Sequence, residues 1–63
     1  MSNLYEPKRR WRTFHNIDKE AIVDVNEIIA LYGVEDGTLL MFSNGDELVV
    51  DEDITEVKAE MFL

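Results

Sequence analysis

The basic segment Lys8, Arg9, Arg10, Trp11 and Arg12 is the cluster in this sequence best suited to bind an anion. Guanidinium groups bind phosphate or carboxylate through paired N–H donors, and an aromatic ring beside them can stack on a flat ligand. In one interpretation, several copies of the segment converge in a homo-oligomer and bind a nucleotide or another anionic ligand. In the other, which we favour, the segment docks on the acidic body of its own chain or of a neighbouring chain.

Residues for nucleophilic catalysis are scarce. A hydrolytic site needs a Ser, Thr or Cys nucleophile beside a base that a third group orients. The sequence contains no cysteine and one histidine, His15. Ser43 stands beside a predicted hairpin turn, where a small polar residue is common in β structure. We therefore predict no catalytic residue and no enzymatic activity.

The acidic residues between positions 46 and 53 raise the question of a metal site. A calcium-binding EF-hand loop needs Asp-x-Asn/Asp-x-Asn/Asp-Gly. Counted from Asp51, the third position fits as Asp53, but Thr55 and Glu56 occupy the fifth and sixth. Acidic residues before a helix also complement the positive end of its dipole. We predict a helix-capping acidic loop, with no metal and no cofactor.

Charge is unevenly distributed along the chain. Residues 1–12 carry four basic residues and one acidic residue, whereas the remainder carries two lysines and thirteen acidic residues. An acidic body repels nucleic acid at long range, which makes nucleic acid an improbable partner and a basic protein surface the expected one. An acidic DNA mimic is a less favoured alternative, because the carboxylates gather at hairpin ends and not in one long stripe.

The length of 63 residues allows one small domain, and without cysteine its core depends on packing or on association with another chain. No apolar run approaches the roughly 18 residues of a membrane span, so no membrane insertion is expected. The residues after the basic segment are too polar for a signal peptide. We predict a cytoplasmic protein with a basic extended arm over residues 1–10 and a single β-rich domain over residues 11–63.

The pattern of apolar and turn-forming residues predicts this domain to be mainly β. Strands are expected at residues 11–15, 21–25, 28–34 and 38–43, followed by another that ends at Val50. Asp53 and Glu56 form a capping-box pattern ahead of a short amphipathic helix. The predicted fold is a small β-meander or barrel-like sheet of three to five antiparallel strands with a short C-terminal helix.

Asn44 and Gly45 predict a two-residue type I′ hairpin turn, which pairs Leu40 with Val49. With that register, Leu39, Met41, Leu48 and Val50 share one face, and Leu40, Phe42 and Val49 share the other. Both faces are then apolar, so the helix or a second copy of the chain must cover the second face. The predicted oligomer or partner interface consists of Leu40, Phe42, Val49 and Tyr32.

From about residue 22 to residue 57, the order of these signals resembles the FlbD/SwrD family of small flagellar proteins. The matching segments are Glu27–Ile28–Ile29, Asp36–Gly37–Thr38, Ser43–Asn44–Gly45, Val49–Val50–Asp51–Glu52 and Glu56–Val57. The family usually has Asn–Pro before its acidic-Leu-Ile stretch and lysines after the glycine, whereas this chain has Val25–Asn26 and Asp46–Glu47. The resemblance implies a small, β-rich, non-catalytic protein that contacts larger machinery.

These observations together predict a small non-catalytic binding protein, an adaptor or inhibitor-like regulator, that acts through protein–protein contacts as a homo-oligomer. The alternative is a homo-oligomer that sequesters a nucleotide or other anionic ligand with the basic-aromatic segment.

Overall fold

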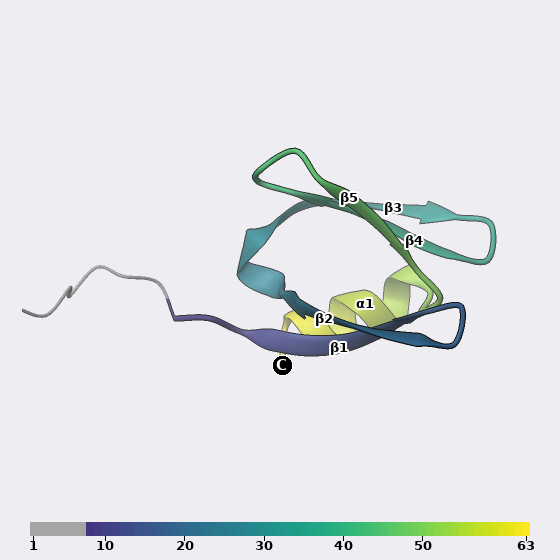
Figure 1. The fold of residues 1–63 in the computed structure, drawn as a ribbon, viewed down its shortest axis with the longest axis horizontal. Helices are drawn as coiled ribbons and strands as arrows, with labels where there is room; N and C mark the ends of the chain where they lie inside the picture. The colour runs from purple at the N-terminus through teal and green to yellow at the C-terminus, as the bar shows by residue number, and fades with distance from the viewer. Residues whose placement is uncertain (1–7) are drawn as a thin grey trace, which may run out of the picture.

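The computed structural model describes residues 8–63, which form five antiparallel strands and one C-terminal helix (Figure 1). The chain is mainly β, as the sequence predicted. Residues 1–7 of the predicted arm lie outside the described residues. No helix within residues 8–63 is long and apolar enough to span a membrane. The elements are β1 Trp11–Asn16, β2 Lys19–Asp24, the 3-10 helix η1 Val25–Glu27, β3 Ile28–Val34, β4 Gly37–Phe42, β5 Glu47–Val50 and α1 Ile54–Met61.

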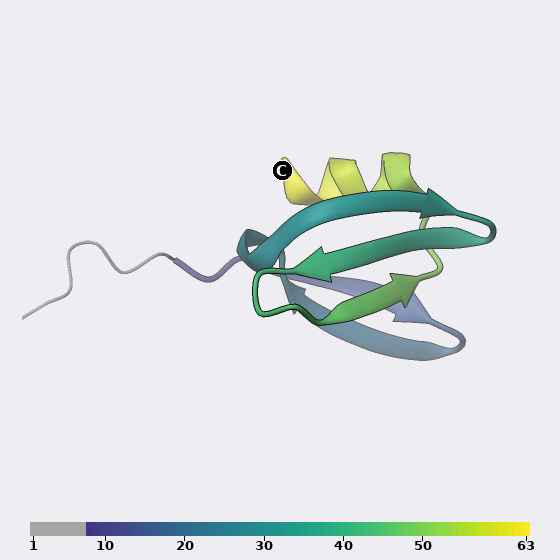
Figure 2. The ribbon, with the colours of Figure 1, turned by 90° about the horizontal axis from the view of Figure 1, so that it is seen from above.

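The strands form two sheets that do not close into a barrel. One layer is the three-stranded sheet β3–β4–β5, and the other contains the β1–β2 hairpin with α1 beside β1 (Figures 1 and 2). At one end the layers meet, because the Asp51 N–H donates to the His15 backbone oxygen at 2.7 Å and Asn16 Nδ2 donates to that of Val49 at 2.6 Å. The layers separate toward the other end, on the side away from α1.

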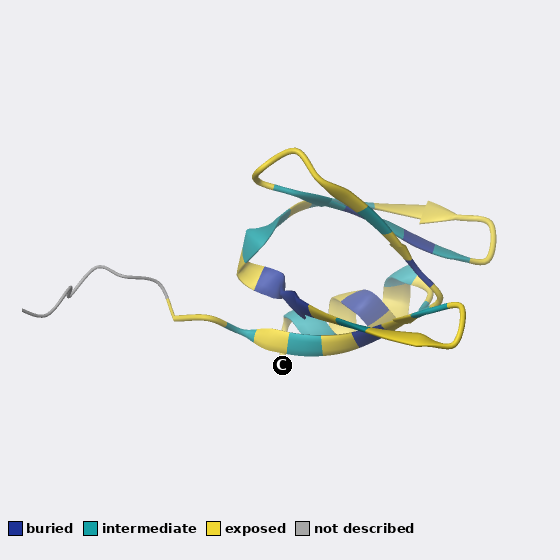
Figure 3. Ribbon diagram, viewed as in Figure 1, coloured by how far each residue is buried: buried dark blue, intermediate teal, exposed yellow. Residues whose placement is uncertain are grey.

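The core lies between the two layers (Figure 3). Alternation along β1 turns Phe14 inward, where it is fully buried, and leaves Thr13 and His15 exposed. From the helix, Ile54, Val57 and Met61 recur at helical spacing, and Val57 is fully buried. The buried apolar residues are Phe14, Val23, Val25, Leu40, Val50 and Val57.

The predicted capping box of α1 is confirmed. Glu56 N–H donates to Asp53 Oδ1 at 2.9 Å, and the Asp53 N–H donates to Glu56 Oε1 at 3.2 Å. These bonds satisfy two N–H groups that the first turn of a helix leaves unpaired. Because α1 has only eight residues, it depends on docking against β3 and β4 for most of its stability.

The hairpin between β4 and β5 differs from the prediction by one residue. Leu40 pairs with Leu48 and not with Val49. The loop has three residues, because the Gly45 N–H donates to the Phe42 backbone oxygen at 2.9 Å and Gly45 takes a φ of 95°. The Asp46 N–H donates to Asn44 Oδ1 at 2.9 Å, which stabilises this longer loop.

The corrected register changes which residues share a face, because side chains alternate along a strand. Leu40 and Phe42 lie on the core face, and Leu40 is fully buried, so Leu40 is unavailable to a partner. Val49 and Tyr32 pair with Leu39 on the opposite, outward face and are 45% and 52% exposed. The predicted interface residues therefore divide between two faces.

Two turns have unusual backbone geometry. In the β1–β2 turn, Ile17 and Asp18 have φ angles of 45° and 64°, and the side chain of Ile17 is 78% exposed. In the β3–β4 hairpin, Gly37 packs so closely on β5 that a Cβ atom there would lie 2.0 Å from the Val50 backbone oxygen. Next to it, the buried Thr38 hydroxyl donates to the Glu52 backbone oxygen at 2.8 Å, which fixes the link between β5 and α1.

Candidate functional site

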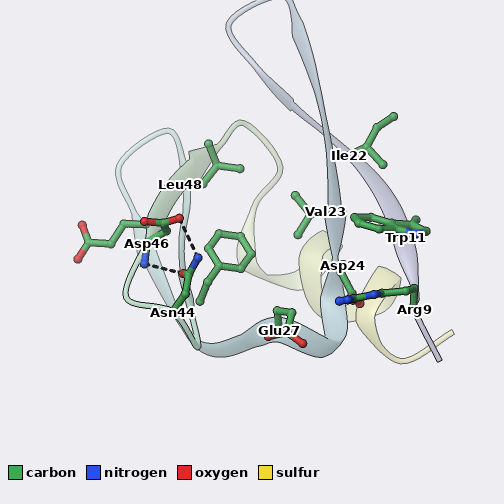
Figure 4. Close-up of a pocket in the computed structure, with 11 residues that line it drawn as sticks. Arg9, Trp11, Ile22, Val23, Asp24, Glu27, Asn44, Asp46 and Leu48 are labelled. Carbon is green, nitrogen blue, oxygen red and sulfur yellow. Dashed lines mark hydrogen bonds and ion pairs between the residues drawn. The ribbon is translucent and has the colours of Figure 1, made fainter. Parts of the chain in front are cut away.

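An open cleft of about 590 Å³ lies where the two layers separate, between β2 and β5. Val23, Phe42 and Leu48 give it an apolar floor. Figure 4 shows Trp11 and Arg9 on one wall, with Asp46 and Leu48 across from them. The residues that complete the lining are Ile22, Asp24, Glu27, Asn44 and Glu47.

The strand edges that border this cleft carry no neighbouring strand in the described chain. β2 pairs only with β1, and β5 pairs with β4. The Val25 N–H donates to the Arg10 backbone oxygen, so hydrogen-bonded pairs alternate along β1 and β2 and Ile22 falls at a non-bonded position. The Phe42 N–H donates to the Asp46 backbone oxygen, which places Glu47 at a non-bonded position in β5. The backbone N–H and C=O groups of Ile22 and Glu47 therefore point away from their own sheets.

Asp24 anchors the basic segment to the wall of the cleft. Its side chain is buried, and Oδ1 accepts the N–H groups of Arg10 at 3.1 Å and Asn26 at 3.0 Å. Arg9 Nη1 donates to Oδ2 at 3.1 Å. Burial alone would raise the pKa of Asp24, but these hydrogen bonds and the charge of Arg9 outweigh it and lower the pKa below its usual range. The carboxylate is therefore ionised at neutral pH.

The other arginines of the basic segment contact α1. The Arg10 guanidinium donates to the backbone oxygens of Met61 and of Leu63, the latter at 3.2 Å. Arg12 Nε donates to the Glu60 backbone oxygen at 3.2 Å and lies 3.9 Å from its carboxylate. Cations at this position complement the negative end of the helix dipole and bind backbone oxygens that the helix leaves free.

The five predicted ligand-binding residues therefore do not surround one pocket. Arg9 and Trp11 line the cleft, Arg10 and Arg12 lie against the end of α1, and Lys8 is exposed. All three guanidinium groups contact their own chain, as the docking interpretation of the segment expects.

A second groove, of about 580 Å³, lies between β1 and α1. His15 Nδ1 lies 2.6 Å from Glu52 Oε2 at its end. The hydrogen bond with Glu52 raises the pKa of His15. Partial burial alone would raise the pKa of Glu52, but the hydrogen bonds from His15 outweigh this effect, so the pKa of Glu52 lies below its ordinary value. This pair links β1 to the loop before α1.

Sequence reasoning did not predict the cleft. Its floor and acidic rim come from segments far apart in the chain. The angle between the two layers determines how close together these segments lie. The available signal was Asp24, because it is the single carboxylate in the apolar run at residues 21–25 of a chain with an arginine cluster upstream. Buried carboxylates need such partners.

Within residues 8–63, no three His, Asp or Glu side chains gather in an arrangement that could hold a metal ion. No protein-family model, curated protein or solved structure matches this chain. The resemblance to the FlbD/SwrD family therefore stays a prediction from the sequence.

Proposed function

We propose that this chain is a non-catalytic binding protein, an adaptor or inhibitor-like regulator, that acts in the cytoplasm through contacts with a basic protein partner. The observation that carries the proposal is the cleft between β2 and β5, which combines an apolar floor with an acidic rim. Protein interfaces have this arrangement, with an apolar centre that supplies affinity and a charged rim that selects the partner.

The exposed apolar side chains beside the cleft support this use. Trp11 is 55% exposed and Ile22 is 64% exposed. A tryptophan supplies a large contact area at low entropic cost and is enriched at the energetic centres of interfaces. The acidic rim, made by Glu27, Asp46 and Glu47, favours a partner with lysine or arginine around its apolar contact.

The test is capture of a partner from the native host with charge-reversed variants. Asp46→Lys/Glu47→Lys reverses the rim, whereas Glu35→Lys/Asp36→Lys makes the same change of net charge at exposed residues of the β3–β4 turn that do not line the cleft. We expect one protein to co-purify with the unmodified chain and with the control, and to be lost with the rim variant. Equal loss with both variants would show that net charge alone drives the association.

We also propose that the protein is a homo-oligomer through the outward face of β3–β4–β5. This face carries Ala30, Tyr32, Leu39, Met41 and Val49, with Glu47 beside Met41 at one end. Both α1 and the β1–β2 hairpin lie on the other side of the sheet (Figure 1). Two copies that each carry a net charge of −8 repel each other, so an apolar face offers the least costly contact. A two-fold arrangement would place the same patch on both sides.

Light scattering tests the oligomer. We expect a mass above the 7.3 kDa of one chain for the unmodified protein, and the monomer mass for Tyr32→Glu/Val49→Glu, because two introduced charges would be buried unpaired. A mass of 7.3 kDa at every concentration of the unmodified protein would contradict this assembly.

A further inference from the structure

We propose that the cleft binds an extended segment of the partner as an added β-strand along the free edge of β2, with an apolar side chain over the floor and lysine or arginine side chains at the acidic rim. This inference rests on the proposed protein-binding function and specifies how the partner is held.

The free edge of β2 offers the backbone groups that strand addition uses. Glu20 and Ile22 lie at non-bonded positions of the β1–β2 ladder, so their N–H and C=O groups face away from β1. The edge of β5 has fewer free backbone groups. The Val49 backbone oxygen already accepts a hydrogen bond from the side-chain amide of Asn16, and the Asp51 N–H donates to the His15 backbone oxygen. An unpaired edge of this kind is a template for another strand.

The floor of the cleft fits the alternation of an extended segment. Side chains along a strand point to opposite faces, so every second side chain of a segment beside β2 turns toward the interior of the cleft. There it meets Phe42 and Leu48, which are only partly buried by the chain itself. An apolar side chain at that position would complete the burial of both residues.

The charges around the cleft indicate which residues flank the apolar side chain in the bound partner segment. Glu27, Asp46 and Glu47 lie on its lining, whereas the Arg9 charge is neutralised by the Asp24 carboxylate at 3.1 Å. The remaining charge at the rim is therefore negative. It attracts a segment that carries lysine or arginine and repels an acidic segment.

The test uses synthetic peptides and the full chain labelled for NMR. The first peptide is the acetylated and amidated heptapeptide of alternating Lys and Val. Two further peptides have the same side chains but carry N-methyl groups on alternate amides: one peptide is methylated on the N–H groups that point to one edge of the strand, and the other on those that point to the opposite edge. A fourth peptide has Glu in place of Lys. We expect the first peptide to slow amide exchange at Glu20 and Ile22 by about tenfold or more at saturation.

At least one N-methylated peptide and the Glu peptide should produce no such slowing. A variant of the protein gives an independent comparison: Ile22→Pro removes the N–H that faces the peptide and should abolish binding. Ile22→Ala removes the same side chain but keeps that N–H, so it should bind the peptide more weakly than the unmodified chain and still slow amide exchange at position 22. If Ile22→Pro does not fold, the N-methylated peptides decide the question alone.

Three outcomes would overturn the proposal. Equal binding of both N-methylated peptides would show contact through side chains without strand addition, and protection of Glu47 in place of Ile22 would assign the peptide to β5. Absence of saturable binding by the first peptide would reject this class of ligand. None of these results bears on partner capture with the rim variants, which tests the proposed function separately.

Discussion

Nδ1 of His15 on β1 lies 2.6 Å from Oε2 of Glu52 in the loop before α1, and the His15 N–H donates to the other oxygen of the same carboxylate at 3.0 Å. One carboxylate therefore holds both the backbone and the ring of His15. The Thr38 hydroxyl donates to the Glu52 backbone oxygen, so Glu52 also connects to the sheet β3–β4–β5. A change of charge at this pair should therefore affect how the two layers are held together.

This pair predicts a pH-dependent stability. The pKa of His15 is raised above its ordinary value of 6.5, so its contribution is fully present below that pH and is lost as pH rises through the folded-state pKa. The pKa of Glu52 is lowered, so its contribution is present above its ordinary value of 4.5 and is lost as pH falls through the folded-state pKa. We expect His15→Gln to lower the melting temperature most between pH 4.5 and pH 6.5, where both contributions are fully present.

Thermal unfolding of the two proteins over a range of pH measures this difference, and an NMR titration of the His15 ring measures its pKa directly. Glu52→Gln is the matched control, because it keeps an oxygen acceptor for the His15 N–H and removes the charge. It should return the pKa of His15 toward 6.5. A difference in melting temperature that does not vary with pH would contradict the ion pair.

The close approach of Gly37 to β5 predicts a severe effect of substitution. A Cβ atom at Gly37 would meet the Val50 backbone oxygen at 2.0 Å, and neither backbone can yield without disturbing the β4–β5 pairing. We expect Gly37→Ala to lower the free energy of unfolding by about 3 kcal/mol or more. Chemical denaturation measures this loss.

Two other glycines serve as controls for Gly37→Ala. A Cβ atom at Gly33 would lie 3.9 Å from Ile54 Cγ2, an ordinary contact, so Gly33→Ala should change stability by less than about 1 kcal/mol. Gly45 has open space around it but a φ of 95°, so Gly45→Ala should cost about 1 kcal/mol through backbone strain. Similar losses for all three would show that close approach is not the cause at Gly37.

The β1–β2 turn predicts a stabilising substitution. Ile17 is β-branched and takes a φ of 45°, a conformation that such residues rarely adopt. Its side chain is 78% exposed, so little burial is lost on replacement. We expect Ile17→Asn to raise the free energy of unfolding by about 1 kcal/mol. Ile17→Val keeps the branched side chain and should give no such gain, and a gain from both would point to the removal of apolar surface instead.

The capping box of α1 predicts a further loss. Asp53→Ala removes the acceptor of the Glu56 N–H and should cost about 1 kcal/mol. Asp53→Ser supplies another acceptor at the same position, so its free energy of unfolding should lie close to that of the unmodified protein. Helical circular dichroism together with thermal unfolding distinguishes these variants, and an unchanged melting temperature for Asp53→Ala would show that docking alone fixes the helix.

The strands and the helix were accessible to sequence reasoning because their signals are local. Residues 28–34 were predicted as a strand and form β3, and Asp53 with Glu56 marked the start of α1. The register of the last hairpin was not accessible in the same way. Asn44–Gly45 fits both a two-residue and a three-residue loop, and with apolar residues on both faces the alternation pattern does not choose between them.

The candidate site was harder to predict than the fold. The basic segment was recognised from its composition, and the favoured interpretation was docking on the acidic body of its own chain or of a neighbouring chain. The individual bonds of Arg10 and Arg12 to the end of α1 depend on tertiary placement, which composition does not report. The cleft depends on the angle between the two layers. No pattern in the sequence reports that angle.

The bonds of Arg9, Arg10 and Arg12 to their own chain have an effect beyond local stability. They hold Arg10 and Arg12 against the end of α1, away from the acidic rim of the cleft, while the chain as a whole carries a net charge of −8. A cationic molecule therefore experiences attraction well before it touches this protein. Its rate of encounter should fall steeply as added salt shortens the range of that field.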